Sequence, residues 1–338
     1  ASILHRDDGY VMAFYSKHGS DDLMRYRVTS TNTGDLTQWE PEQTLDHGSG
    51  VTYSNPFLLS EEDGKIYLFF RGESIDPHYY ASTNRGDTWE GAHKLMVSPG
   101  ERPYVKYACD GSNTIHFVYT EAHPDSYAGT SIYHMYYRNG GLYQSDGTFI
   151  TNLVDAPIAP QLGTKIYDGT NATGEGWTWD VHLDTNGYPV VPYATFASRS
   201  PDDHRYRYAR WDGSQWHDNE VAYGGTRLYN DQASYSGGIC VDPEQPEVVY
   251  ISSDVNITNG LANSSGRYEL YRGSTPDFGA SWEWRAITTN SIADNLRPIV
   301  PIGHTNETTV LWLNGTYTTY TSYDLDVVGL FGSNVVVE

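Results

Sequence analysis

The chain has 338 residues, a formal net charge of −22, and a high aromatic content that includes 29 tyrosines and 9 tryptophans. This excess of negative charge argues against nucleic-acid binding as the main role, and no stretch of the sequence is long and apolar enough to cross a membrane. No low-complexity linker divides the sequence, so we predict a single domain over residues 1–338. We also predict a secreted or periplasmic monomer. Because the chain begins at Ala1 inside a strand-like run, without a signal peptide, we expect a processed or trimmed product.

A loop signature recurs along the chain, at residues 82–89 and 275–282 and more loosely at residues 30–39. Each copy follows a strand-like run and combines an Asn or Asp, a Gly and a final Trp. The Asn or Asp side chain can bond to the turn backbone, Gly supplies a positive φ, and Trp can pack on the sheet. The signature resembles the Asp-box on the hairpin turns of bladed β-propellers, where it marks the scaffold and not the chemistry.

Six repeats of short strands and Gly-containing turns follow one another in chain order. They begin near Ser2, Val51, Arg102, Trp179, Tyr235 and Arg297. Four short strands per repeat predict an all-β fold, a β-propeller. A β-sandwich would not explain the recurring turn. We expect seven blades, because the first and last repeats look incomplete and a seventh blade could be closed from both termini or begin upstream of Ala1.

Polar residues at the starts of the innermost strands are expected to converge around the axis of such a propeller. The candidates are Tyr53, Arg102, Asp180, His182, Tyr235 and Arg297. An acidic protein that gathers arginines at its axis is expected to bind an anion there. Each candidate also has a structural interpretation. Tyr53 could be a packing residue, Arg71 a buried partner in a salt bridge, and Arg102 and Arg297 partners in ion pairs between blades.

Several segments resemble a family of propeller-type polysaccharide lyases with BNR-type repeats, which includes ulvan lyases and related rhamnosyl-glucuronate lyases. They are residues 14–19, 53–59, 66–72, 102–107 and 123–137. The resemblance implies β-elimination of a uronic acid in an anionic, ulvan-type polysaccharide, with no cofactor required for the chemistry.

The resemblance also implies roles for individual residues. Arg71 would neutralise the C5 carboxylate, Tyr53 would be the acid or base, and His18 matches a family histidine. We expect the charge of Arg71 to lower the pKa of Tyr53. The residues expected to bind substrate are Arg102, His123, His134, Tyr235 and Arg297. Family members also carry an Asp-Asp-His-Asn segment just before the strand that starts here at Ala1. This sequence does not include that segment, so either a trimmed chain has lost it or the active site differs.

Two further features leave alternatives open. Cys109 and Cys240 are best interpreted as buried free thiols, with a disulfide or a metal thiolate as alternatives. His123, His182 and Cys240 could form a structural zinc or calcium site, although no metal-ligand spacing such as C-x-x-C is present.

Three function classes fit the sequence. The lyase is favoured, because it alone accounts for Tyr53, Arg71, the His18 loop and the His-Pro segment together. A sialidase-like glycoside hydrolase would need three arginines around a carboxylate, for which Arg71, Arg102 and Arg297 are available, and a Tyr–Glu pair. A non-catalytic carbohydrate-binding propeller would bind without turnover.

Overall fold

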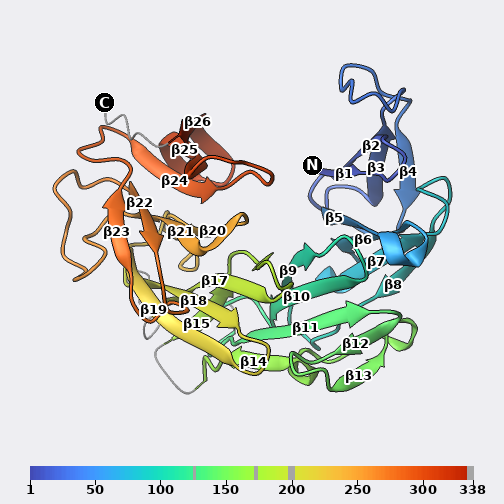
Figure 1. Ribbon diagram of the computed structural model, residues 1–338, viewed down its shortest axis with the longest axis horizontal. Coiled ribbons are helices and arrows are strands. Elements are labelled where there is room, and N and C mark those ends of the chain that lie inside the picture. Colours follow the sequence, from blue (N-terminus) through green and yellow to red (C-terminus); the bar gives the residue numbers. More distant parts are fainter. Residues whose placement is uncertain (125–126, 171–173, 197–201, 333–338) are drawn as a thin grey trace. The chain divides into compact units, whose positions relative to one another are not determined.

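The computed structural model describes residues 1–124, 127–170, 174–196 and 202–332 of the chain (Figure 1). The chain divides into two compact units, unit 1 with residues 1–117 and 134–164 and unit 2 with residues 118–133 and 165–338. Unit 1 contains two four-stranded antiparallel sheets in which the strand order follows the chain order. The strands of the first are β1 (Ser2–His5), β2 (Val11–Tyr15), β3 (Leu23–Val28) and β4 (Gln43–Asp46). The strands of the second are β5 (Thr52–Leu59), β6 (Lys65–Arg71), β7 (Pro77–Ser82) and β8 (Glu90–Lys94).

A third sheet has the order β13-β12-β11-β10-β9, with β14 paired to β11. Its strands are β9 (Tyr104–Cys109), β10 (Thr114–Thr120), β11 (Ile132–Arg138), β12 (Gly141–Tyr143), β13 (Phe149–Asn152) and β14 (Thr164–Tyr167). Helical structure in the described residues consists of short 3-10 turns: η1 (Ser60–Glu62), η2 (Glu73–Ile75), η3 (Leu153–Asp155) and η4 (Pro160–Leu162). No helix in these described ranges has the length and hydropathy needed to cross a membrane.

Unit 2 contains three further antiparallel sheets. The first has the order β15-β17-β18-β19, with β16 paired to β17. Its strands are β15 (Glu175–Thr178), β16 (His182–Leu183), β17 (Pro189–Phe196), β18 (His204–Trp211) and β19 (Trp216–Gly225). The next is formed by β20 (Ile239–Asp242), β21 (Gln245–Ser253), β22 (Glu269–Ser274) and β23 (Glu283–Ala286), and the last by β24 (Asp294–Ile299), β25 (Thr308–Thr319) and β26 (Ser322–Gly332).

The six predicted repeats correspond to these six sheets. The first repeat, expected to be incomplete, forms a full four-stranded sheet, whereas the last has three strands within the described residues. The single domain and the seventh blade stay predictions. Both cysteines are free, Cys240 buried and Cys109 half-buried, which confirms the free thiols and places Cys109 nearer the surface than expected.

The recurring loops have the hydrogen bonds that their sequence predicts. In the first tight copy, the N–H of Thr88 donates to Oδ1 of Asn84 (2.9 Å). In the second, the N–H of Ser281 donates to Oδ1 of Asp277 (2.8 Å), and Gly279 has φ +89°. In the loose copy Asp35 takes this role, accepting from the N–H of Thr37 at 2.8 Å. An acceptor side chain and a positive-φ glycine therefore fix each turn.

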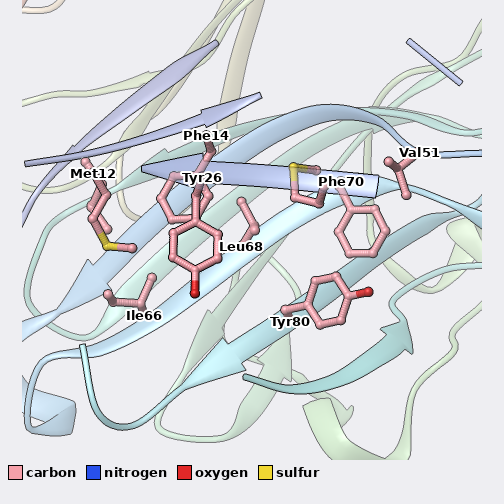
Figure 2. Packing of buried hydrophobic residues seen from close by; sticks show 10 residues of the cluster. Met12, Phe14, Tyr26, Val51, Ile66, Leu68, Phe70 and Tyr80 are labelled. Carbon is pink, nitrogen blue, oxygen red and sulfur yellow. The ribbon is translucent and has the colours of Figure 1, made fainter. Parts of the chain in front are cut away.

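The core of unit 1 lies between its first two sheets (Figure 2). Met12 and Phe14 on β2 and Tyr26 on β3 pack against side chains of the second sheet. Trp89, at the end of the loop after β7, meets Phe14 edge-on, with ring centroids 5.8 Å apart. Each such buried apolar side chain contributes roughly 1.5–3 kcal/mol, so this packing holds β5 and β6 in place beside the site described next.

Candidate functional site

A β-bulge at the start of β5 presents Tyr53. The pairing of β5 with β6 shifts register between Thr52 and Asn55, and Tyr53 has φ +65°, in the left-handed region that a bulky residue rarely adopts. The Tyr53 side chain is consequently 45% exposed, although both flanking residues are buried. A bulge of this kind re-aims a side chain, and strained backbone of this kind is concentrated at functional sites.

Arg71 lies directly against Tyr53, because Thr52 pairs with Arg71 across β5 and β6. The guanidinium carbon of Arg71 is 4.8 Å from the ring centroid of Tyr53 and 5.0 Å from that of Tyr104. The Nε and Nη1 atoms of Arg71 are buried and have no hydrogen-bond partner. Arg71 also forms no ion pair with any residue that the structure describes. The alternative interpretation of Arg71 as a salt-bridge partner thus finds no support among the described residues, and none of them balances its positive charge.

His18 completes this cluster. It lies in the loop after β2, with Nδ1 2.8 Å from Oγ1 of Thr52 and its ring edge-on to Tyr53 at a centroid distance of 5.7 Å. The loop is tied to the start of β5 by the N–H of Gly19, which donates to the carbonyl of Val51 (2.7 Å). His18, Tyr53 and Arg71, which the sequence predicted as partners, are thus brought together within unit 1.

The pKa of Tyr53 differs from the prediction. Burial is the largest effect and raises the pKa of Tyr53, and the neighbouring Tyr104 raises it further. The positive charges of Arg71 and Arg102 lower it. The net pKa lies above its ordinary value of 10.0. The charge of Arg71 lowers the pKa of Tyr53, as expected, but desolvation outweighs the cation, so the net shift is upward. Tyr53 is therefore protonated at neutral pH and suited to donate a proton.

Two other residues belong to the cluster. Arg102, predicted to bind substrate, is close enough to influence the pKa of Tyr53. Tyr104, on β9, has its ring centroid 5.0 Å from the guanidinium carbon of Arg71 and was not singled out from the sequence. Its position two residues after Arg102, at the start of the strand-like run that follows, is the signal that could have identified it.

Unit 2 contains a second arginine with aromatic neighbours. Arg297 has φ +52° at a register shift between β24 and β25. Its guanidinium carbon is 5.2 Å from the ring centroid of Tyr235, 5.6 Å from that of Trp179 and 5.7 Å from that of Tyr317. Its Nε is buried without a hydrogen-bond partner. The structure brings together Tyr235 and Arg297, which were both predicted to bind substrate. The contacts of Trp179 and Tyr317 with Arg297 were not predicted from the sequence.

Two predicted substrate-binding histidines are buried elsewhere. His134 on β11 is 1% exposed, with Nε2 3.0 Å from Nδ1 of His116 and Nδ1 2.8 Å from Oγ of Ser145. His123 is 3% exposed and packs on Trp177, with ring centroids 4.9 Å apart. Side chains this deeply buried have no open surface for a polymer, so the geometry gives these two assignments no support.

The predicted metal ligands do not form a metal centre. Among the described residues, no group of three or more His, Cys, Asp or Glu side chains is arranged to hold a metal ion. His182 instead has Nε2 3.0 Å from Oδ2 of Asp180. Burial lowers the pKa of His182, but the charges of Asp180 and Asp242 outweigh it and the pKa is raised. Burial also raises the pKa of Cys240 well above its ordinary value, so this thiol is protonated. Within the described ranges, His123, His182 and Cys240 are therefore not grouped as metal ligands.

The comparisons with known proteins agree with an all-β propeller. The chain is similar to an ulvan lyase, described as a new family of polysaccharide lyase, in a structure bound to -[GlcA(1-4)Rha3S]-. The two sequences are 16% identical, the match covers 98% of this chain and 78% of that chain, and the TM-score is 0.68. A second structure of ulvan lyase gives the same values. An α-L-arabinanase of Penicillium chrysogenum, in complex with arabinobiose, has 13% identity, coverage of 97% and 92%, and a TM-score of 0.51.

At these identities the similarity shows the fold alone, and it confirms the predicted propeller class. No curated protein matches the chain. A family model described as BNR repeat-containing family member matches residues 1–223. Because this match extends over more than half of the sequence, the chain belongs to the BNR repeat-containing family.

Proposed function

We propose that the protein is a polysaccharide lyase that cleaves a uronate-containing, ulvan-type polysaccharide by β-elimination. The observation that carries this proposal is Arg71, which has two side-chain nitrogens without partners, Nε and Nη1, and a guanidinium within 5.0 Å of the ring centroids of both Tyr53 and Tyr104. A half-buried guanidinium without an ion-pair partner among the described residues, in a protein of net charge −22, is suited to a planar carboxylate, which accepts two parallel hydrogen bonds from a guanidinium.

The elimination begins with the C5 carboxylate bound to Arg71. Neutralising this carboxylate stabilises the negative charge that develops when the C5–H bond breaks. His18 removes the C5 proton. If Nδ1 of His18 donates to Oγ1 of Thr52, Nε2 has a lone pair available for this step.

The leaving group departs with the help of Tyr53. As the C4–C5 double bond forms, the C4–O4 bond breaks and Tyr53 gives its proton to O4. The raised pKa of Tyr53 keeps this proton in place until it is needed. Exchange with water then returns a proton to Tyr53 and removes one from His18. Tyr235 and Arg297 are proposed as further contacts to the anionic polymer, outside the cell where such polymers occur.

A sialidase-like hydrolase is the second candidate, because arginines and a tyrosine also form the sialidase site. Such an enzyme needs a glutamate that activates the tyrosine. The groups with the largest effects on the pKa of Tyr53 are Arg71, Tyr104 and Arg102, and none of these is an acid. This observation favours the lyase.

The test is absorbance near 235 nm while the protein acts on ulvan, with other uronate polymers and a sialoside in parallel. A rise is expected with ulvan, since elimination creates a C4–C5 double bond, and it should be lost in Arg71→Gln. Release of reducing ends without a rise in absorbance would favour the hydrolase. Binding without any product would identify a carbohydrate-binding propeller.

A further inference from the structure

A pocket of about 430 Å³ lies on the sheet of β20–β23 in unit 2, apart from the residues discussed so far. This volume is within the roughly 300–1,000 Å³ of ligand pockets in proteins. Tyr271 on β22 and Trp284 on β23 supply its aromatic surface, and residues of the loop between β21 and β22 supply its polar wall (Figure 1 shows these strands). Every described residue that lines the pocket is uncharged.

The aromatic floor depends on two small residues. Gly273 pairs with Trp284 across β22 and β23, and Tyr271 pairs with Ala286. A Cβ atom at Gly273 would lie 2.5 Å from the Trp284 ring, so this ring lies flat across the glycine. Trp282 stacks beside it, with centroids 5.5 Å apart and an interplanar angle of 25°. The alternation of large and small residues thus holds the indole ring of Trp284 against the sheet, where it lines the pocket.

The polar wall is organised by its own hydrogen bonds. The N–H of Asn256 donates to the carbonyl of Leu261 (2.7 Å), closing the turn. Oδ1 of Asn256 accepts from the hydroxyl of Thr258 at 2.8 Å, and Oδ1 of Asn263 accepts from the N–H of Gly266 at 2.8 Å. Asn256, Thr258 and Ser264 are exposed. The amides and hydroxyls therefore lie in a fixed frame beside the rings, where they can pair with ligand hydroxyls.

We propose that this pocket binds an uncharged pyranose unit of a polysaccharide. A pyranose ring has an apolar face of C–H groups, which packs on an indole, and equatorial hydroxyls, which pair with amides and hydroxyls. An anionic sugar unit would find no cation among the lining residues. The pocket therefore differs in ligand class from the arginine clusters around Arg71 and Arg297, and its role as a secondary binding site does not depend on the elimination chemistry.

The experiment uses affinity electrophoresis of the full chain in gels that contain carboxyl-reduced, desulfated ulvan, a neutral polymer that offers no anion to Arg71. Neutral xylan serves as a second probe. We expect the neutral polymers to retard the wild-type protein. Trp284→Ala should raise the dissociation constant roughly tenfold or more, because most of the apolar contact is lost. Trp284→Phe keeps a flat ring and should retain most of the binding.

Trp39→Ala is the matched control, since it removes a half-buried tryptophan from unit 1 and should leave retardation unchanged. Thermal unfolding of each variant checks that the sheet is intact. Retardation by native ulvan alone, or by none of the polymers, would overturn the proposal. Equal retardation of the wild-type protein and Trp284→Ala by the neutral polymers would place their binding site elsewhere and would overturn it as well.

Discussion

Tyr53 combines backbone strain with a specific environment. A bulky residue at a positive φ costs of order 1–3 kcal/mol, which the surrounding structure must offset. The bulge brings the phenol ring of Tyr53 close to both the His18 ring and the guanidinium of Arg71. A packing tyrosine could occupy regular strand backbone without this cost, so the strain supports a functional role for the hydroxyl group.

We predict that Tyr53→Phe lowers kcat by at least about a hundredfold and changes KM little, because proton donation to O4 contributes only in the transition state. The measurement is initial rates at 235 nm over a range of substrate concentrations. Tyr10→Phe is the control, since Tyr10 also lies under an arginine, with Arg6 5.2 Å from its ring centroid, and its turnover should match that of the wild-type protein. Near-normal kcat in Tyr53→Phe would assign the proton donor elsewhere.

The pH profile tests the direction of proton transfer. The pKa of Tyr53 is raised above 10.0, so the phenol keeps its proton at all lower pH values. If Tyr53 is the acid, kcat should not fall on the alkaline side until the pH exceeds about 10. If Tyr53 instead acted as the base, kcat would still rise with pH through this range. Rates from pH 6 to pH 10.5, with circular dichroism to confirm folding, distinguish the two directions.

At the scale of elements, the recurring loops are rigid turns packed onto neighbouring strands. Gly279 has φ +89°, and a Cβ there would lie 2.7 Å from the ring of Tyr208. That ring is fully buried and its hydroxyl donates to the carbonyl of Pro246 at 2.7 Å, so it has little freedom to move. Gly34 of the loose copy has a similar φ of +79° but open space around it.

We predict that Gly34→Ala lowers the free energy of unfolding by about 1 kcal/mol through left-handed strain alone. Gly279→Ala should cost roughly 1–3 kcal/mol more, because it adds overpacking to the same strain. Denaturant unfolding of both variants measures the difference. Equal destabilisation would mean that the sheet yields to the extra methyl group.

A buried pair of histidines in the third sheet makes stability depend on pH. Burial lowers the pKa of His116 to about 4 and that of His134 well below its ordinary value. The unfolded chain takes up a proton at His116 near pH 6.5, whereas the folded chain does so only near pH 4. The unfolded state therefore binds more protons between these values, and stability falls as the pH falls through this window.

We predict that His116 accounts for a loss of roughly 3 kcal/mol between pH 6.5 and pH 4. His116→Gln should therefore flatten the decline of melting temperature with falling pH, whatever its effect at pH 7. Burial raises the pKa of Glu121, so this group makes stability increase as the pH falls. Its contribution is the same in the wild-type protein and in His116→Gln, so it does not affect their comparison. An unchanged slope in His116→Gln would show that other groups control the acid transition.

The sequence predicted the elements and the local part of the site, because both depend on nearby residues. Tyr53 and Arg71 meet because their strands are adjacent and joined by a short turn. Tyr104 was missed because its contact with Arg71 joins two different sheets. Trp179 and Tyr317 were missed because a repeat pattern does not specify which side chains surround Arg297. His123 and His134 were overvalued, because polar residues within Tyr-rich strands are also used as buried hydrogen-bonding groups.

At the scale of the whole molecule, the net charge of −22 opposes the approach of the anionic polymer that we propose as substrate. The field of the whole chain repels such a polymer at long range, whereas the unpaired donors of Arg71 and Arg297 attract it at short range. Salt screens the two effects differently, because exposed charges are screened beyond the Debye length and partly buried ones much less.

We therefore predict that kcat/KM on ulvan rises as NaCl increases from about 0.01 M to about 0.15 M, where the Debye length falls from about 30 Å to about 8 Å. Most proteins that bind polyanions show the opposite trend, because cations dominate their surfaces. Short oligosaccharides from the reaction, which carry an unsaturated end, serve as control substrates. Because they carry few charges, their kcat/KM should depend less on salt. Initial rates at substrate concentrations far below KM give the measurement. A monotonic decline with salt would mean that the arginine contacts outweigh the field of the acidic surface even at long range, and the proposed separation of the two effects would then fail.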